Sequence, residues 1–312
     1  MLNNLALIIG VTLMYSTPLI FTALGGVISE KSGVVNIGLE GMMVIGAFIA
    51  ATVGYYSGNP WLAFVSGGLG GAFFGLLHAV ASVTFSANQV VSGIAINFLG
   101  PGVALFLSRI FFNGATTTRS IDLDNKIPRL LHGIFPNDSF LYYVFDNQYA
   151  TSYIAFILVF IIWYLLKKTV FGLRLKSVGE HPAAADTLGI NVFRIRYFAV
   201  ISSGFLAGLG GATLSISVVS NFRPTLVSGQ GFIALAAMIF GKWKPIETMF
   251  ACLLFGLAQG LVIFVGQFDF HISSQLLNML PYILTLIVLV IFVGKSVAPA
   301  ADGIPYEKEQ KH

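Results

Sequence analysis

The acidic residue Glu40 lies within an otherwise apolar run that extends from residue 34 to residue 54. An ionisable side chain in such surroundings is costly unless a polar partner or a water-filled cavity accommodates it. We therefore expect Glu40 to face other parts of the protein or water. Two interpretations of its role stay open: it lines or gates a pathway, or it hydrogen-bonds the backbone of a broken helix.

The sequence contains no arrangement of residues typical of an enzyme. It has no Gly-x-x-x-x-Gly-Lys-Ser/Thr phosphate loop, no His-Glu-x-x-His motif, no pair of cysteines and no Gly-x-Ser-x-Gly turn. Of the five histidines only His78 lies in an apolar segment, where we expect it to hydrogen-bond a neighbouring helix. The sequence thus predicts no catalytic site, and no metal or cofactor held by this chain.

The composition indicates an all-α polytopic membrane protein. Of the 312 residues 56% are hydrophobic and 10% are charged, against roughly 25% charged residues in soluble domains. Several apolar runs approach the roughly 20 residues that a helix needs to cross a bilayer, and they lack the alternation of β-barrel strands. The stretch 231–241 is too short to span straight across and predicts a tilted, broken or re-entrant helix. The count is about eight to ten helices in a single transmembrane domain, 1–312, with predicted spans at residues 5–28, 34–54, 61–85, 88–112, 151–166, 197–219, 246–265 and 275–293.

Lysine and arginine gather in the loop 167–196 and recur in the tail 294–312. Short loops rich in these residues stay in the cytoplasm. The long loop 113–150 has no positive excess, so we expect it to lie outside, with the N-terminus outside and the C-terminus cytoplasmic. The distribution of charge therefore matters more than the formal net charge of +4, which does not imply a nucleic-acid partner.

Glycines recur at every fourth position in two predicted spans. One span carries Gly67, Gly71 and Gly75, and the other carries Gly204 and Gly208. Such spacing lets helix backbones approach closely in a membrane. We expect these residues to serve helix packing rather than contact with a solute.

Residues 33–43 weakly resemble residues 229–238. Each stretch follows a long helix and a polar break, and then continues as an apolar helix interrupted by glycine. The predicted topology makes the two stretches run in opposite directions, as do the paired segments that transporters place around a central pathway. A chance similarity between glycine-rich apolar stretches is the alternative.

The loop 167–196 contains the sequence VGEHPAAADTLGIN at residues 178–191. Pro182 suits the first turn of a helix and Gly189 its C-terminal exit, so a helix of about two turns is predicted. The segment resembles the cytoplasmic coupling helix of ABC importer permeases and its Glu-Ala-Ala...Gly pattern. The candidates for coupling to an ATPase are Glu180, Pro182, Ala184, Asp186 and Gly189.

Residues 30–42, 88–97 and 229–236 resemble permeases of the family that serves branched-chain amino acids, simple sugars and nucleosides. The runs Asn-Ile-Gly-Leu-Glu-Gly and Gly-Glu-His-Pro are most similar to the nucleoside (guanosine-type) branch, and the resemblance covers nearly the whole chain. It implies a bacterial cell-membrane importer with several partners. These are a cytoplasmic ABC ATPase that holds ATP and Mg, an extracellular substrate-binding lipoprotein, and a second related permease in a heterodimer.

These observations predict a permease subunit that passes nucleosides, in particular purine nucleosides, into the cell. A nucleoside path needs apolar or aromatic walls and few polar groups. The same machinery for simple sugars or branched-chain amino acids is the alternative. A stand-alone secondary transporter or channel is less favoured because a proton or sodium relay would find few buried acids. The candidates for the substrate pathway are Asn36, Glu40, Asn97, Gln230 and Phe232.

Overall fold

The computed structural model describes residues 2–136, 139–266 and 296–308, together with the single positions 279, 283, 286 and 287. The described residues form a helical bundle that contains no strand, only one isolated β-bridge between Arg129 and Tyr149. Among them, 7 helices are long and apolar enough to cross a membrane. The prediction of an all-α polytopic membrane protein is confirmed.

The long helices are separated by three shorter ones, and single π-helical turns extend α3 to Thr84 and α8 to Val218. The loop before α5 holds two short turns, Leu123–Asn125 and Tyr142–Asp146. The predicted span 275–293 lies almost entirely outside the described residues. The helices are α1 (Leu2–Glu30), α2 (Leu39–Ser57), α3 (Pro60–Ala79), α4 (Gln89–Phe111), α5 (Ala150–Lys168), α6 (Val170–Glu180), α7 (Pro182–Thr187), α8 (Val192–Thr213), α9 (Gln230–Phe240) and α10 (Pro245–Val265).

Side chains just before the helices set where α3 and α4 begin. The Asn59 side chain accepts hydrogen bonds from the first N–H groups of α3, and Pro60 takes the first helical position, where an N–H is not needed. Asn88 caps α4 in the same way. Gly58, in the left-handed conformation with φ of 64°, ends α2 and allows the tight connection to α3.

Three local features differ from or refine the sequence-based prediction. The second span begins at Leu39 and not at residue 34, because residues 31–38 form a turn whose backbone is bound by other helices. Helix α9 has 11 residues, about 16 Å at 1.5 Å per residue, so it is too short to cross a bilayer, as predicted. Helix α6 was not predicted, although its buried positions Gly172, Leu175 and Val178 recur at every third residue.

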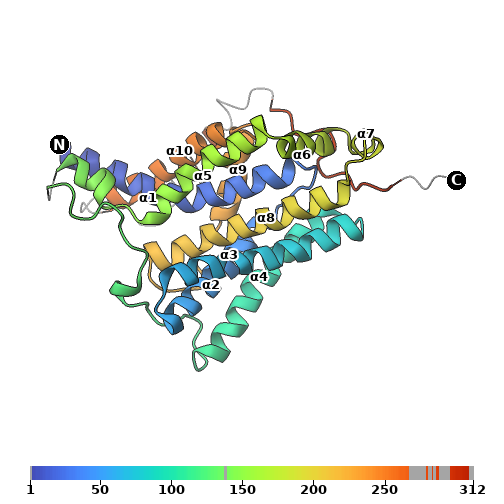
Figure 1. Cartoon of the computed structure of the whole chain (residues 1–312). Coiled ribbons are helices and arrows are strands. Elements are labelled where there is room, and N and C mark those ends of the chain that lie inside the picture. The colour runs from blue at the N-terminus through green and yellow to red at the C-terminus, as the bar shows by residue number, and fades with distance from the viewer. Residues whose placement is uncertain are drawn as a thin grey trace.

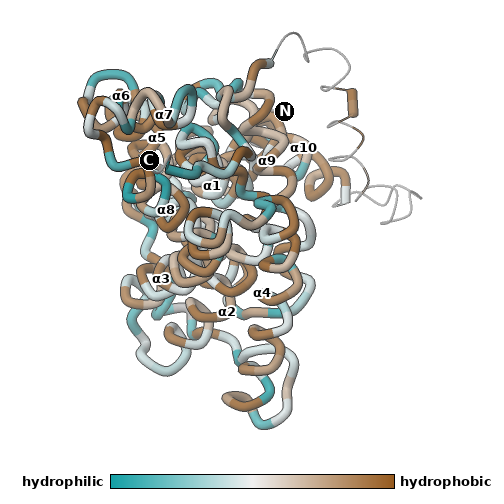
Figure 2. The backbone as a smooth tube through the Cα atoms, turned by 90° about the vertical axis from the view of Figure 1, so that its right-hand side faces the viewer, coloured by the Kyte–Doolittle hydropathy of each residue, from teal (hydrophilic) through white to brown (hydrophobic). Residues whose placement is uncertain are grey.

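Helix α8 lies at the centre of the bundle and packs against α1, α2 and α3 (Figure 1). On the other side of α1 lie α10, α9 and α5. The N-terminus lies at one end of the bundle, and α6, α7 and the C-terminal segment lie at the opposite end. Figure 2 looks onto this second end, where hydrophilic residues gather in the turns while the long helices are largely hydrophobic.

The predicted glycine faces of α3 and α8 pack directly against each other. A methyl group on Gly71 would overlap with the backbone of Gly204 and Gly208, and one on Gly208 would overlap with the carbonyl of Gly67. A methyl group on Gly75 would lie 2.8 Å from the carbonyl oxygen of Val200. The two backbones are therefore in contact, which confirms the packing role predicted from the spacing.

We expect Gly71→Ala to destabilise the bundle by about 1–3 kcal/mol, because the new methyl group can be accommodated only by separating α3 from α8. Gly102→Ala on α4 is the matched control, since nothing lies within 4 Å of its Cβ position. The thermal midpoint of the detergent-solubilised protein should fall for the first variant and stay within a degree or two for the second. Equal midpoints would contradict the close packing of α3 on α8.

Candidate translocation and coupling sites

The break between α1 and α2 exposes backbone groups inside the bundle, and α3 and α4 bind them. The N–H of Val35 donates to Gln89 Oε1 at 2.7 Å. His78 Nε2 lies 3.0 Å from the Val35 carbonyl oxygen, and His78 Nδ1 lies 2.8 Å from Ser92 Oγ. Because a carbonyl only accepts, Nε2 carries the proton and Nδ1 accepts from the serine hydroxyl. The prediction that His78 hydrogen-bonds a neighbouring helix is confirmed.

Asn36 is fully buried within this break. Its Nδ2 donates to Ser203 Oγ on α8 at 2.9 Å, and its Oδ1 accepts the N–H of Gly38 at 3.1 Å. The side chain thus shapes the turn before α2 and ties it to the central helix.

Asn97 on α4 bridges the turn and the start of α2. Its Nδ2 donates to the Ile37 carbonyl at 2.9 Å, and its Oδ1 accepts the N–H of Gly41 at 2.8 Å. Both ends of the amide are therefore engaged by backbone groups. No apolar side chain could satisfy a donor and an acceptor at once in this way.

Glu40, in the first turn of α2, faces the start of the short helix α9. Its Oε1 accepts the N–H of Gly229 at 2.7 Å, and its Oε2 accepts the N–H of Gly231 at 2.7 Å. A carboxylate at this position satisfies N–H groups that a helix leaves free and is favoured by the helix dipole. Of the two interpretations of Glu40, the structure shows the bonding to a broken helix.

The same contact brings together the two glycine-interrupted stretches 33–43 and 229–238 that resemble each other in sequence. Gly229 has φ of 90°, a left-handed conformation that favours glycine, so its N–H is turned toward the carboxylate. Gln230 and Phe232 follow in the first turn of α9, with Gln230 half-buried and Phe232 49% exposed. Asn36, Glu40 and Asn97 meet around one break, and Gln230 and Phe232 adjoin it. The contact of these five residues with a solute stays a prediction.

We expect Glu40→Gln to weaken the start of α9, because a neutral amide offers one acceptor oxygen and turns its NH₂ group toward a backbone N–H. The loss of charge-assisted bonds should cost about 1.5–3 kcal/mol. Glu247→Gln is the control, since its side chain is 51% exposed. The thermal midpoint should fall only in the first variant. An unchanged midpoint for Glu40→Gln would contradict the role of this carboxylate.

The predicted coupling helix is present as α7. Pro182 occupies its first turn, and Gly189, with φ of 80°, follows its end. Ala185 is buried against Val178 and Val192, which fixes α7 onto α6 and α8. The opposite side of α7 is open: Ala184 is exposed, and so is Leu188, at 80% of its surface. A short helix with small and apolar residues facing outward offers a surface for another protein.

The C-terminal segment 296–308 lies along α6 and α7. It contacts Glu180 and Asp186, two of the residues predicted for coupling to an ATPase, and so connects them to the rest of the bundle. Its contacts are Ala301 N–H to the Gly179 carbonyl at 2.9 Å, Ala300 N–H to Glu180 Oε2 at 3.2 Å, and Lys308 Nζ to Asp186 Oδ1 at 3.4 Å.

Arg196 on α8, which sequence reasoning missed, connects this tail to the break after α1. Its Nε donates to the Ser32 carbonyl at 3.2 Å and its Nη1 to the Ile304 carbonyl at 3.0 Å, while the side chain is 99% buried. Burial raises the pKa of the neighbouring Asp302 to about 7, although the charges of Arg196 and Lys31 oppose this shift. The signal in the sequence was that Arg196 directly precedes the predicted span 197–219, at the edge of an apolar run where charge is costly.

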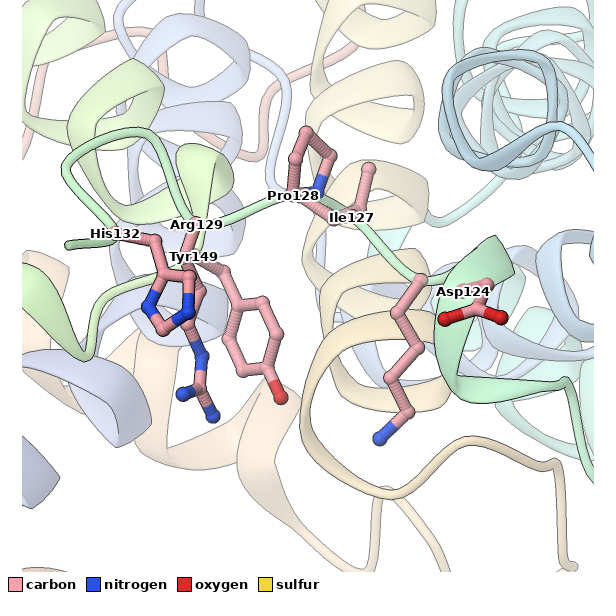
Figure 3. Close-up of a pocket in the computed structure, with 7 residues that line it drawn as sticks. Asp124, Ile127, Pro128, Arg129, His132 and Tyr149 are labelled. Carbon is pink, nitrogen blue, oxygen red and sulfur yellow. The ribbon is translucent and has the colours of Figure 1, made fainter.

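At the opposite end of the bundle, the loop before α5 encloses a surface pocket of about 580 Å³. Figure 3 shows the side chains of Arg129, His132 and Tyr149 gathered on one side of it and Asp124 on the other. The Arg129 guanidinium lies 5.4 Å from the centre of the Tyr149 ring. His132 also lies 3.5 Å from the buried Asp146 carboxylate. The pocket combines positive charge with an aromatic face.

The sequence matches a known protein family. Residues 8–293 match the model of the family described as "Branched-chain amino acid transport system / permease component". The chain therefore belongs to this family of membrane permease components, as the motifs around Glu40 and Gly229 predicted.

Three relatives illustrate its place in the family. The chain is 45% identical to the guanosine ABC transporter permease protein NupQ of Bacillus subtilis, over 98% of both chains. It is 44% identical to the nucleoside ABC transporter permease protein NupC of Lactococcus lactis, over 99% of both. It is 34% identical to the putative glucose ABC transporter permease protein TsgC13 of Haloferax volcanii, over 81% of this chain and 76% of that one. No solved structure matches the chain.

Proposed function

We propose that this chain is the membrane-spanning subunit of an ABC importer that carries nucleosides into the cell. The observation that carries the proposal is the identity of 45% and 44%, over nearly the full length, to permeases named for guanosine and for nucleosides. The relative named for glucose is less similar, at 34%. A nucleoside substrate is therefore favoured over a sugar.

The proposed partners follow from this assignment. A cytoplasmic ATPase would hold ATP and Mg and dock on the exposed side of α7. A second, related permease would complete the pathway, and a substrate-binding lipoprotein would deliver the nucleoside at the end that carries the pocket of Arg129 and His132. The positive charge and the aromatic ring of that pocket suit an acidic docking surface.

A series of contacts that leads from α7 to α9 suggests how ATPase motion would be transmitted. The tail joins α6 and α7, and Arg196 joins the tail to the turn after α1. A methyl group on Gly179 of α6 would overlap with the carbonyl of Lys31, so α6 rests directly on that turn. The turn continues into α2, and Glu40 binds α9. A displacement of α7 would therefore reach the start of α9 through a continuous series of side-chain hydrogen bonds and close backbone contacts.

The substrate assignment is tested by uptake of labelled guanosine into vesicles that contain the complete transporter. We expect uptake only with ATP and the binding protein, with competition by excess adenosine and none by ribose, glucose or leucine. Competition by glucose alone would indicate that the transported substrate is a sugar. Uptake by this chain without ATP would replace the proposal by a stand-alone transporter or channel.

The coupling role of α7 is tested by Ala184→Trp. Because Ala184 is exposed, the variant should fold with an unchanged thermal midpoint, yet its large ring would hold the ATPase away. We expect at least a tenfold loss of both guanosine uptake and co-purifying ATPase. Ala115→Trp, on an exposed alanine in the loop at the other end of the bundle, is the control and should retain ATPase binding. Normal coupling in Ala184→Trp would show that α7 is an ordinary connector.

The proposed orientation places residues 113–150 outside and residues 167–196 in the cytoplasm. In a Cys252→Ser background, single cysteines at Ser139 and Ser177 should differ: an impermeant thiol reagent added to intact cells should label only the first. Because both positions are half-buried, labelling in permeabilised cells is the reference for accessibility. Labelling of Ser177→Cys from outside would show that the orientation is opposite to the proposed one.

A further inference from the structure

A pocket of about 380 Å³ lies at the end of the bundle that carries α6 and α7. It opens where α1 and α5 end, beside α6 and the start of α10. Four lysines and two tryptophans dominate its lining: Lys31, Lys167, Lys176, Lys244, Trp163 and Trp243.

The charges of this pocket are unbalanced. Its one lining acid, Glu247, lies 3.5 Å from Lys244 and offsets a single ammonium group. Lys31 is half-buried: burial lowers its pKa, and the charges of Lys176 and Lys244 lower it further, while those of Glu180 and Asp302 oppose them. An anion bound among these ammonium groups would relieve this repulsion.

The tryptophans place the pocket at the edge of the apolar layer. Trp163 lies in the last two turns of α5, where the Lys167 ammonium lies 5.3 Å from its ring, and indole rings favour the boundary between lipid and water. Trp243 is held in place because its Nε1 donates to Glu30 Oε2 at 2.6 Å.

Along α5 and α10, away from these lysines and toward the apolar layer, the helices turn apolar side chains outward. Phe160 on α5 is 56% exposed, and Phe250 on α10 is 61% exposed. Helix α10 also begins at the pocket, at Pro245, without a side-chain cap for its first N–H groups, so its dipole adds positive potential there. A ligand with a phosphate and acyl chains would meet cations at its head and apolar residues along its tails.

We propose that this pocket is a binding site for the phosphate headgroup of an anionic phospholipid, held by Lys31, Lys167, Lys176 and Lys244 against the rings of Trp163 and Trp243. Basic pockets between spanning helices are suited to such headgroups. A soluble phosphate would meet the same cations but would gain nothing from the apolar surface of α5 and α10. We therefore assign the lipid as the occupant.

The three tryptophans of the chain allow a direct test. The third, Trp61, lies in the first turn of α3 outside the pocket, so Trp61→Phe leaves only Trp163 and Trp243 as tryptophan fluorescence reporters. The full-length variant is reconstituted in phosphatidylcholine that contains a fixed fraction of brominated phosphatidylglycerol or, in parallel, of brominated phosphatidylcholine. We expect the brominated phosphatidylglycerol to quench at least about fivefold more effectively at low mole fraction.

Charge removal separates a specific site from a general attraction. Lys167→Gln, Lys176→Gln and Lys244→Gln together should abolish the preference for phosphatidylglycerol, since each lysine near the surface contributes roughly fivefold to the binding of anionic lipid. The control removes the same charge from the same end outside the pocket, at Lys168, Arg174 and Arg194, and should keep the preference.

Three outcomes would overturn the proposal. The first is equal quenching by the two brominated lipids when all lysines are present. The second is an equal loss of the preference for phosphatidylglycerol in the control variant. The third is a loss of this preference when millimolar inorganic phosphate is added. The last would assign the pocket to a soluble phosphate. The comparison of lipids with all lysines present needs no charge variant, so the test stands even if the triple variant fails to fold.

Discussion

Backbone N–H and C=O groups inside an apolar bundle must find partners within the protein. Within the residues that the structure describes, this constraint governs two places where the chain leaves a helix inside the bundle. At the first, residues 31–38, the partners are side chains of α3, α4 and α8, including His78, Gln89 and Asn97. At the second, the start of α9, the partner is Glu40. An orphaned donor or acceptor here would cost several kcal/mol, so each break needs polar side chains that bind its backbone groups.

The constraint explains why an acid is tolerated in an apolar run. Two backbone N–H groups and the dipole of α9 stabilise the Glu40 carboxylate, and the carboxylate in turn permits a helix to begin within the bundle. Glycine makes the geometry accessible. A methyl group at Gly231 would lie 2.5 Å from the Glu40 Cα, so only glycine allows α9 to approach α2 this closely. Charge and close packing therefore support each other at one contact.

Much of this architecture could be predicted from residue patterns, because those patterns arise from local physics. Apolar length predicted the spans that the structure describes, glycine at every fourth residue predicted the close helix packing that α3 and α8 show, and Pro182 with Gly189 predicted α7. The start of α2 was wrong by several residues because the apolar run continues through the break. The partners of Arg196 and Asn36 could not be predicted, since Ser32, Ile304 and Ser203 are distant in sequence and were brought near only by folding.

The arrangement also limits what the candidate pathway residues can do in this conformation. The amide of Asn97 and the carboxylate of Glu40 are both engaged by backbone groups. They become available to a solute hydroxyl only if α9 or the turn before α2 moves. Such a movement would release the carboxylate and two N–H groups of α9 together, and a ribose, with adjacent hydroxyls that both donate and accept, could satisfy both sets. A solute that carries only donors or only acceptors would leave one of the two sets unsatisfied.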